Sequence, residues 1–212
     1  MIALALIGVP LAAAAAAFAW RSERSRPWLL PAAGVAHAAL SIAILVNPPV
    51  AAPGAWLAID PVARAVLPAI SLLFLACSVY GVAYLRVRRE RPNRVFVVAF
   101  LALLGLMSLA IEAQHLGLLW VAAEAATLTT VPLLHFNGTA RAFEATWKYL
   151  LIGGTGLALA LLGSFCLGYA SFQGGGGGDL TFAALVAKGS VMSRPWVLVA
   201  WVLLLAGYGT KM

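Results

Sequence analysis

Long apolar runs that recur along the whole chain are the feature that most restricts how this protein can fold. A helix needs roughly 20 apolar residues to cross a bilayer core of about 30 Å. Runs of about this length occur seven times, over residues 2–20, 28–47, 65–85, 95–111, 116–136, 149–171 and 195–212. The sequence therefore predicts an all-α membrane protein, a polytopic bundle of about seven transmembrane helices.

The composition indicates that lipid rather than water surrounds these helices. Of the 212 residues, 63% are hydrophobic and only 10% are charged, which leaves too few polar side chains to cover a water-soluble globule. The connectors between the runs are short and carry most of the charge, so none of them can fold alone. We expect a single transmembrane domain over residues 1–212, in a multi-pass protein of a bacterial or archaeal inner membrane.

The basic residues are distributed unevenly between the connectors. Lys and Arg accumulate in cytoplasmic loops, and here ten of the 14 basic residues fall in odd-numbered connections while three fall in even-numbered ones. This bias predicts that the odd-numbered loops are cytoplasmic and that the N-terminus is outside. It also accounts for the net charge of +7 without a nucleic-acid partner. The ten are Arg21, Arg24, Arg26, Arg86, Arg88, Arg89, Arg91, Arg94, Arg141 and Lys148, and the three are Arg64, Lys188 and Arg194.

Patterns that often mark a cofactor or metal site are weak in this sequence. Cys77 and Cys166 lie in apolar runs without metal-ligand spacing. The histidines are scattered over different depths, which disfavours haem ligation. The glycine run 174–178 lacks the Lys-Ser/Thr ending of a phosphate-binding loop, so a flexible outer loop is predicted. We expect no cofactor and no metal.

One acidic residue lies deep in the fifth apolar run. Glu124 comes eight residues after Leu116, which places it at a depth of roughly 12 Å, where a charge costs about 2.5 to 3.5 kcal/mol. Thr127 and Thr130 follow at steps of three and form a polar stripe with it on one helix face. The pattern favours a functional role for Glu124, with a hydrogen-bonded carboxyl that joins two helices as the alternative.

Two lysines and a second glutamate are further candidates. Lys211 follows Gly207 and Gly209, which weaken a helix, and broken membrane helices place ionisable groups near mid-membrane; the alternative is a lysine that reaches the inner interface. Lys148 opens the sixth run between aromatic residues and fits either an interface anchor or a functional group. Glu112 lies near the end of the fourth run, where a wet turn accounts for it.

Small residues recur along the sixth run at steps of four. They are Gly156, Ala160, Ser164 and Gly168. Such a ridge allows two helix backbones to approach closely in a membrane. It predicts a helix-packing face and requires no catalytic explanation.

Three segments, in this order, resemble successive signatures of one family. They are HLGLLWVAAEAATL over residues 115–128, EATWKYLLIG over 144–153 and AGYGTK over 206–211. The family is that of the antiporter-like, proton-translocating membrane subunits of respiratory complex I, Mrp sodium/proton antiporters and membrane-bound nickel-iron hydrogenases. The sequences of these motifs are most similar to those of the hydrogenase and formate hydrogenlyase branch. Residues 1–109 resemble the family only in topology and in an aspartate, Asp60, before the third run.

The resemblance implies a role for three residues. Glu124 matches the glutamate of the fifth family helix, Lys211 the lysine of the broken seventh helix, and Lys148 a lysine of the sixth. The first two form the pair that the family is thought to use in proton transfer. The resemblance further implies that the chain has no redox centre of its own. Its partners are expected to be other membrane subunits and the peripheral redox arm of a multisubunit complex, beside the lipid bilayer.

The chain departs from the family in its length. Family members have around fourteen helices, and the resemblance therefore implies an N-terminal fragment, in which the lysine of the eighth helix and the exit group of the twelfth are absent. A proton-translocating subunit of an energy-converting oxidoreductase is the leading hypothesis. The alternatives are an Mrp-type cation/proton antiporter subunit, a polytopic membrane enzyme that acts on a lipid substrate, and a structural membrane scaffold.

Overall fold

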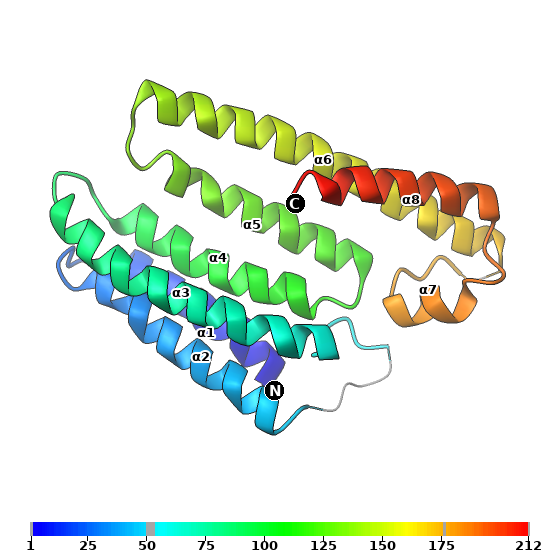
Figure 1. Cartoon of the computed structure of the whole chain (residues 1–212), viewed down its shortest axis with the longest axis horizontal. Coiled ribbons are helices and arrows are strands. Elements are labelled where there is room, and N and C mark those ends of the chain that lie inside the picture. The colour runs from blue at the N-terminus through cyan, green and yellow to red at the C-terminus, as the bar shows by residue number, and fades with distance from the viewer. Residues whose placement is uncertain (1, 50–53, 176, 212) are drawn as a thin grey trace.

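The computed structural model describes residues 2–49, 54–175 and 177–211, and within them the chain forms a bundle of helices (Figure 1). Gly176 of the glycine run and Met212 at the end of the last predicted span lie outside the described residues. The helices are α1 (Ile2–Ala19), the short 3-10 helix η1 (Arg26–Trp28), α2 (Leu29–Val46), α3 (Pro61–Val87), α4 (Arg94–Glu112), α5 (Leu116–Leu134), α6 (Ala140–Gln173), α7 (Phe182–Lys188) and α8 (Arg194–Gly209).

Among the described residues, six helices are long and apolar enough to cross a membrane, namely α1 to α6, with α2 counted together with η1. Helix α8 is also apolar but has only 16 residues. The prediction of an all-α, polytopic membrane protein is therefore confirmed. Successive long helices run in opposite directions, so the odd-numbered connections lie at one end of the bundle and the even-numbered ones at the other (Figure 1).

Helix α6 begins well before the predicted start of the sixth span at residue 149. Its first residue is Ala140, because the hydroxyl of Thr139 accepts a hydrogen bond from the backbone N–H of Ala142 at 3.1 Å and caps the helix there. The charged residues that follow Ala140 are compatible with a helix. The prediction placed the start at residue 149 because it followed only the apolar part of the segment. A capping carboxylate starts α3 in the same way, since Asp60 accepts from the N–H of Ala63 at 2.6 Å.

The connection between α6 and α8 contains a short helix, α7, that was not predicted. The predicted flexible loop over residues 174–178 lies before it. The side chain of Thr181 caps α7, and the carboxylate of Asp179 accepts from the N–H of Thr181 at 2.9 Å. This hydrogen bond lowers the pKa of Asp179 below its ordinary value. Backbone hydrogen bonds from Leu116 N to Leu180 O (3.1 Å) and from Phe182 N to Gln114 O attach the connection to the start of α5.

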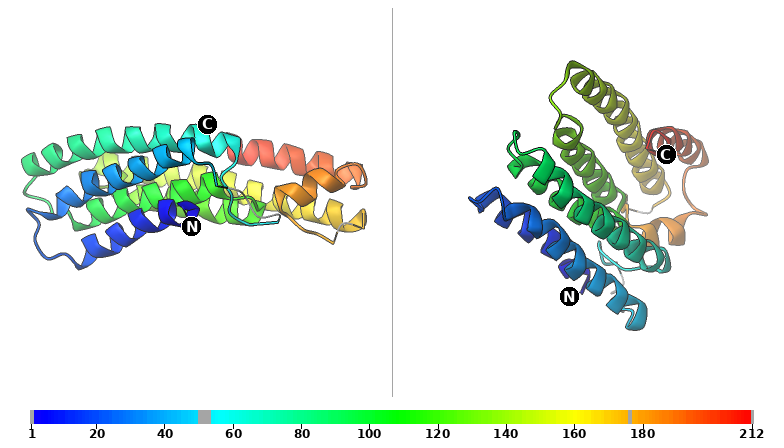
Figure 2. Two further views of the ribbon diagram at one scale, coloured as in Figure 1. Left: turned by 90° about the horizontal axis from the view of Figure 1, so that it is seen from below. Right: turned by 60° about the vertical axis from the view of Figure 1, so that its left-hand side comes forward.

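The core lies among α1 to α4, and α5, α6 and α8 extend the bundle to one side (Figure 2). Leu30, Phe74 and Leu101 are among the residues buried in this core. Many large apolar side chains point outward instead, such as Leu73 and Trp201, each 65% exposed. A water-soluble protein does not expose so much apolar surface, so these side chains face lipid.

Candidate functional site

Helices α6 and α8 pack with their backbones in contact. A Cβ added at Gly207 would lie 2.5 Å from the backbone nitrogen of Ala160 and 2.6 Å from the carbonyl oxygen of Gly156, so α8 can lie here only because residue 207 has no side chain. Gly156 and Ala160 of the predicted ridge therefore contact α8. Gly168 does not belong to this contact, because the atom nearest to an added Cβ there belongs to Leu180.

This packing brings the end of α8 against α5. Helix α8 ends at Gly209, and the next two residues form a turn. The ammonium of Lys211 donates a hydrogen bond to the hydroxyl of Thr127 at 2.8 Å and lies 5.2 Å from the centre of the Tyr149 ring. A Cβ added at Gly153 would lie only 2.7 Å from the Lys211 nitrogen. Thr127, Tyr149 and Gly153 therefore form the contact surface for this ammonium.

Glu124 lies one helical turn before Thr127, on the same face of α5. Its side chain is half-buried, and its Oε2 atom is buried without a hydrogen-bond partner among the described residues. No ion pair joins Glu124 to Lys211 in the part of the chain that the structure describes. Thr127 is about 4.5 Å further along the helix axis, so Lys211 lies about one turn from the carboxylate.

Hydrogen bonds fix α5 beside α6 and order the polar stripe. The indole N–H of Trp120 donates to the carbonyl oxygen of Leu157 at 2.7 Å, across the two helices. The hydroxyl of Thr127 donates to the carbonyl of Ala123 at 2.8 Å while it accepts from Lys211. The hydroxyl of Thr130 donates to the carbonyl of Thr127. The predicted stripe of Glu124, Thr127 and Thr130 therefore has Lys211 at its middle position.

Lys148 lies apart from this arrangement. Its ammonium pairs with the carboxylate of Glu144, one turn earlier on α6, and both side chains are largely exposed. Its neighbour Tyr149 does contact Lys211. Sequence reasoning did not select Tyr149 or Gly153, although both lie in the segment with the family resemblance, because neither carries a charge and nothing local shows that α8 ends beside them.

A second group of buried polar side chains lies among α2, α3 and α4. The two ring nitrogens of His37, which is fully buried, lie 2.7 Å from the hydroxyl of Ser71 and 2.8 Å from that of Ser108. Glu112, one turn beyond Ser108 on α4, is 0% exposed, and both of its carboxylate oxygens lack a hydrogen-bond partner among the described residues. The interpretation of Glu112 as part of a wet turn is therefore wrong.

The connection before α3 covers the end of α4 and explains this burial. The backbone N–H of Ala58 donates to the carbonyl of Glu112 at 2.9 Å, and the ring of Trp56 stacks on that of His115 at 4.6 Å. Residues 54–60 therefore cover a turn that is short in sequence and looks open. Over the described ranges, no group of three or more His, Cys, Asp or Glu side chains is placed to hold a metal ion.

Fold and site together define a polytopic membrane protein in which a glutamate and a threonine on one apolar helix lie beside a lysine from the turn after another. No family model matches the sequence, but similar proteins exist. The chain is 37% identical over 121 residues to a hydrogenase-4 component F homolog of Methylacidiphilum infernorum. The aligned residues make up 56% of this chain and 25% of that relative. It is 32% identical over 160 residues to the NADH-quinone oxidoreductase subunit N of Desulforudis audaxviator, 75% of this chain and 30% of that relative.

A third relative is the F(420)H(2) dehydrogenase subunit N of Methanosarcina mazei, with 34% identity over 148 residues, 66% of this chain and 28% of the relative. The chain belongs to the family of antiporter-like membrane subunits, as its three motifs indicated. It spans between 25% and 30% of the length of these relatives. The fold is also that of a chain in the membrane-bound sulfane sulfur reductase, an archaeal respiratory membrane complex, with a TM-score of 0.86, 21% identity, and coverage of 98% of this chain and 44% of that one.

Proposed function

We propose that this chain is part of a proton-translocating membrane subunit of an energy-converting oxidoreductase, and that protons move through Glu124 and Lys211. The observation that carries the proposal is the hydrogen bond from the Lys211 ammonium to Thr127, one turn from Glu124. It supports a relay because it holds Lys211, in the turn after α8, against the α5 stripe about one helical turn from Glu124. The names of the relatives favour an oxidoreductase complex over an independent cation antiporter.

The mechanism follows from two positions for the lysine. At Thr127, the ammonium has a neutral hydrogen-bond acceptor and an aromatic face. Next to Glu124, it would have a carboxylate as its partner, which favours both charged forms. Lys211 follows a helix end that contains two glycines, so a change in a few backbone dihedrals there can move it between the two positions. When Glu124 is ionised, movement of a neutral Lys211 toward it favours uptake of a proton by the lysine, and movement of the ammonium away favours release of that proton.

The proposal is tested with Glu124→Gln in the complete subunit, assembled with its partners in proteoliposomes. Glutamine keeps the shape of the side chain but cannot release a proton, so proton translocation, followed with a pH-sensitive dye, should fall while the complex still assembles. Glu124→Asp should retain part of the activity. Glu90→Gln is the matched control, because Glu90 is an exposed residue paired with Arg88 outside the membrane spans. Wild-type pumping by a well-assembled Glu124→Gln complex would show that the glutamate only joins helices.

Lys148 is a second proposed proton-transfer residue, and its exposed pair with Glu144 gives a separate test. If Lys148 carries protons, Lys148→Ala should slow translocation without loss of assembled complex. If it is an interface anchor, the variant should instead lower the amount of assembled complex, and the pumping rate per complex should stay constant.

The proposed orientation places the odd-numbered loops in the cytoplasm, and it decides the direction of proton movement. Ser25 lies at the end of the bundle with the odd-numbered loops and Asn47 at the other end, and both are exposed. In a background without the native cysteines, a membrane-impermeant thiol reagent should label Asn47→Cys but not Ser25→Cys in intact cells. The opposite result would reverse the assigned orientation. The proposed partners are further membrane subunits and a peripheral redox arm.

A further inference from the structure

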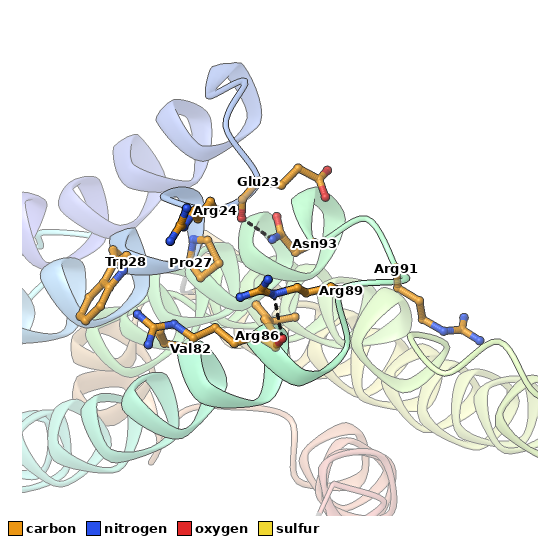
Figure 3. A pocket seen from close by; sticks show the side chains of 10 residues that line it. Glu23, Arg24, Pro27, Trp28, Val82, Arg86, Arg89, Arg91 and Asn93 are labelled. Carbon is orange, nitrogen blue, oxygen red and sulfur yellow. Dashed lines mark hydrogen bonds between the residues drawn. The ribbon is translucent and has the colours of Figure 1, made fainter.

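A basic pocket lies at the end of the bundle that holds the odd-numbered loops. Its volume is about 520 Å³, which is within the range of roughly 300 to 1,000 Å³ for small-ligand sites. The walls come from η1 and the residues before it, the end of α3, and the connector to α4 (Figure 3). The lining residues are Glu23, Arg24, Pro27, Trp28, Val82, Leu85, Arg86, Arg89, Arg91 and Asn93.

Buried hydrogen bonds make the wall of this pocket rigid. Arg26 is fully buried, and its guanidinium donates to the side-chain oxygen of Asn93 at 2.6 Å. The side-chain amide of Asn93 in turn donates to the carbonyl oxygen of Glu23 at 2.7 Å. Because Arg26 and Asn93 are 67 residues apart in the chain, these bonds fix the first connector against the start of α4. The pocket is therefore a built feature and not a gap between mobile loops.

The positive charges of the pocket are not neutralised from within. In the described residues, ion pairs of arginine join only Arg26 to Glu23 at 3.4 Å and Arg88 to Glu90, so the one carboxylate of the lining is already engaged. Figure 3 shows the guanidinium groups of Arg24, Arg86 and Arg89 gathered around the cavity. Arg91 also lines the pocket but donates to the carbonyl oxygen of Phe136 at 3.0 Å.

These charges lie directly beside the lipid-facing surface. The guanidinium of Arg86 lies 5.1 Å from the centre of the Trp28 ring, and the Trp28 side chain is 55% exposed. Tryptophan at the end of a membrane helix marks the level of the lipid headgroups. Arg86 lines the pocket, and Val79 and Leu72, about two and four turns before it on the same face of α3, are 60% and 58% exposed. An apolar surface therefore leads from the pocket along α3 toward the bilayer core.

We propose that this pocket binds the phosphate headgroup of an anionic phospholipid, with the acyl chains along the outer face of α3. Arginine forms paired hydrogen bonds to phosphate oxygens, and three guanidinium groups that have no ion-pair partner among the described residues face one cavity. The apolar path beside Trp28 selects a lipid over a soluble anion. Basic pockets at the cytoplasmic ends of membrane helices suit such headgroups. The bound lipid would hold the first connector and the end of α3 together, and this role does not depend on proton transfer.

The test is native mass spectrometry of the full-length subunit in mild detergent. The probes are phosphatidylglycerol, phosphatidylcholine and inorganic phosphate, titrated separately. Removal of one basic residue near a membrane surface lowers affinity for an anionic lipid about fivefold. Arg89→Gln and Arg24→Gln should therefore each weaken phosphatidylglycerol binding about fivefold. Arg88→Gln is the matched control: it removes the same charge from the neighbouring position, but Arg88 pairs with Glu90 and does not line the pocket.

Each outcome decides for or against the site. Preference for phosphatidylglycerol over phosphatidylcholine, reduced about fivefold in Arg89→Gln and Arg24→Gln but kept in Arg88→Gln, supports the site. Equal weakening of phosphatidylglycerol binding in all three variants would show a non-specific attraction between the basic residues and the anionic lipid, and it would overturn the proposed site. Equal binding of inorganic phosphate would show a soluble-anion site instead. Lipid that binds to the isolated subunit but not to the assembled complex would show that an acidic segment of another subunit occupies the pocket. All variants should pump protons normally, so failure here is distinct from failure of the proposed function.

Discussion

Replacement of Gly153 by alanine tests whether the ammonium of Lys211 must lie against Thr127. The added Cβ would be 2.7 Å from the lysine nitrogen, while ordinary van der Waals contacts begin at 3.4 Å, so the nitrogen has to withdraw by about 0.7 Å. A hydrogen bond that now measures 2.8 Å would then reach about 3.5 Å and be largely lost. The substitution changes no charge and removes no proton-transfer group.

The expected loss follows from the value of that hydrogen bond. A hydrogen bond from a charged group contributes about 1.5 to 3 kcal/mol, and each 1.4 kcal/mol is a factor of about ten in the population of the position that the bond stabilises. Proton translocation by Gly153→Ala should therefore fall about tenfold or more. Stability should fall by less than the full value of that bond, because the displaced atom is the end of a flexible side chain and alanine favours helix over glycine by up to about 1 kcal/mol.

The neighbouring glycine supplies the control. Gly154 is on the same helix, and an added Cβ there would meet nothing within 4 Å, so Gly154→Ala makes the same chemical change without reaching Lys211. Both variants are compared with wild type in proteoliposomes, by dye-monitored proton uptake and by the amount of assembled complex. Equal pumping by the Gly153→Ala and Gly154→Ala complexes would refute the positioning of Lys211 by Thr127.

Three further predictions concern other parts of the fold. Ser108→Ala removes a hydroxyl that contacts buried His37 and should lower the free energy of unfolding by about 1 to 3 kcal/mol, measured by thermal unfolding in detergent; Ser78→Ala, whose buried hydroxyl bonds only within its own helix, should cost less. Gly156→Leu would collide with the end of α8 and cost about 1 to 3 kcal/mol, whereas Gly8→Leu, in open space, should not. The folded-state pKa of Asp179 is lowered from its ordinary value of 3.8, so the contribution of this carboxylate to local stability is present above pH 3.8 and is lost as the pH falls through the lowered pKa. Amide-exchange protection at the start of α7 should therefore decrease as the pH falls below 3.8. Asp179→Ala should abolish this pH dependence.

Several features were predictable because a single physical constraint fixes them. The thickness of the bilayer sets the length of apolar runs, so the all-α fold class and the approximate places of the long apolar helices followed from hydropathy. The cost of a charge in lipid selected Glu124 and Lys211 without knowledge of their neighbours. Boundaries were less accurate, because α6 begins at a threonine cap in a polar stretch that has no hydropathy signal. Helix α7 was missed for the same reason, since it is short and lies in a connector.

The sequence by itself therefore determined the fold class and the residues whose burial in lipid demands a reason. The tertiary structure decided which of them meet. Lys211 and Thr127 are 84 residues apart, and they touch only because Gly207 lets the backbone of α8 lie on that of α6. The burial of Glu112 likewise depends on the connector that covers the end of α4. A local sequence pattern indicates the free energy of placing one residue in lipid or in water. Contacts between helices that are far apart in the sequence depend instead on how closely the helix surfaces fit.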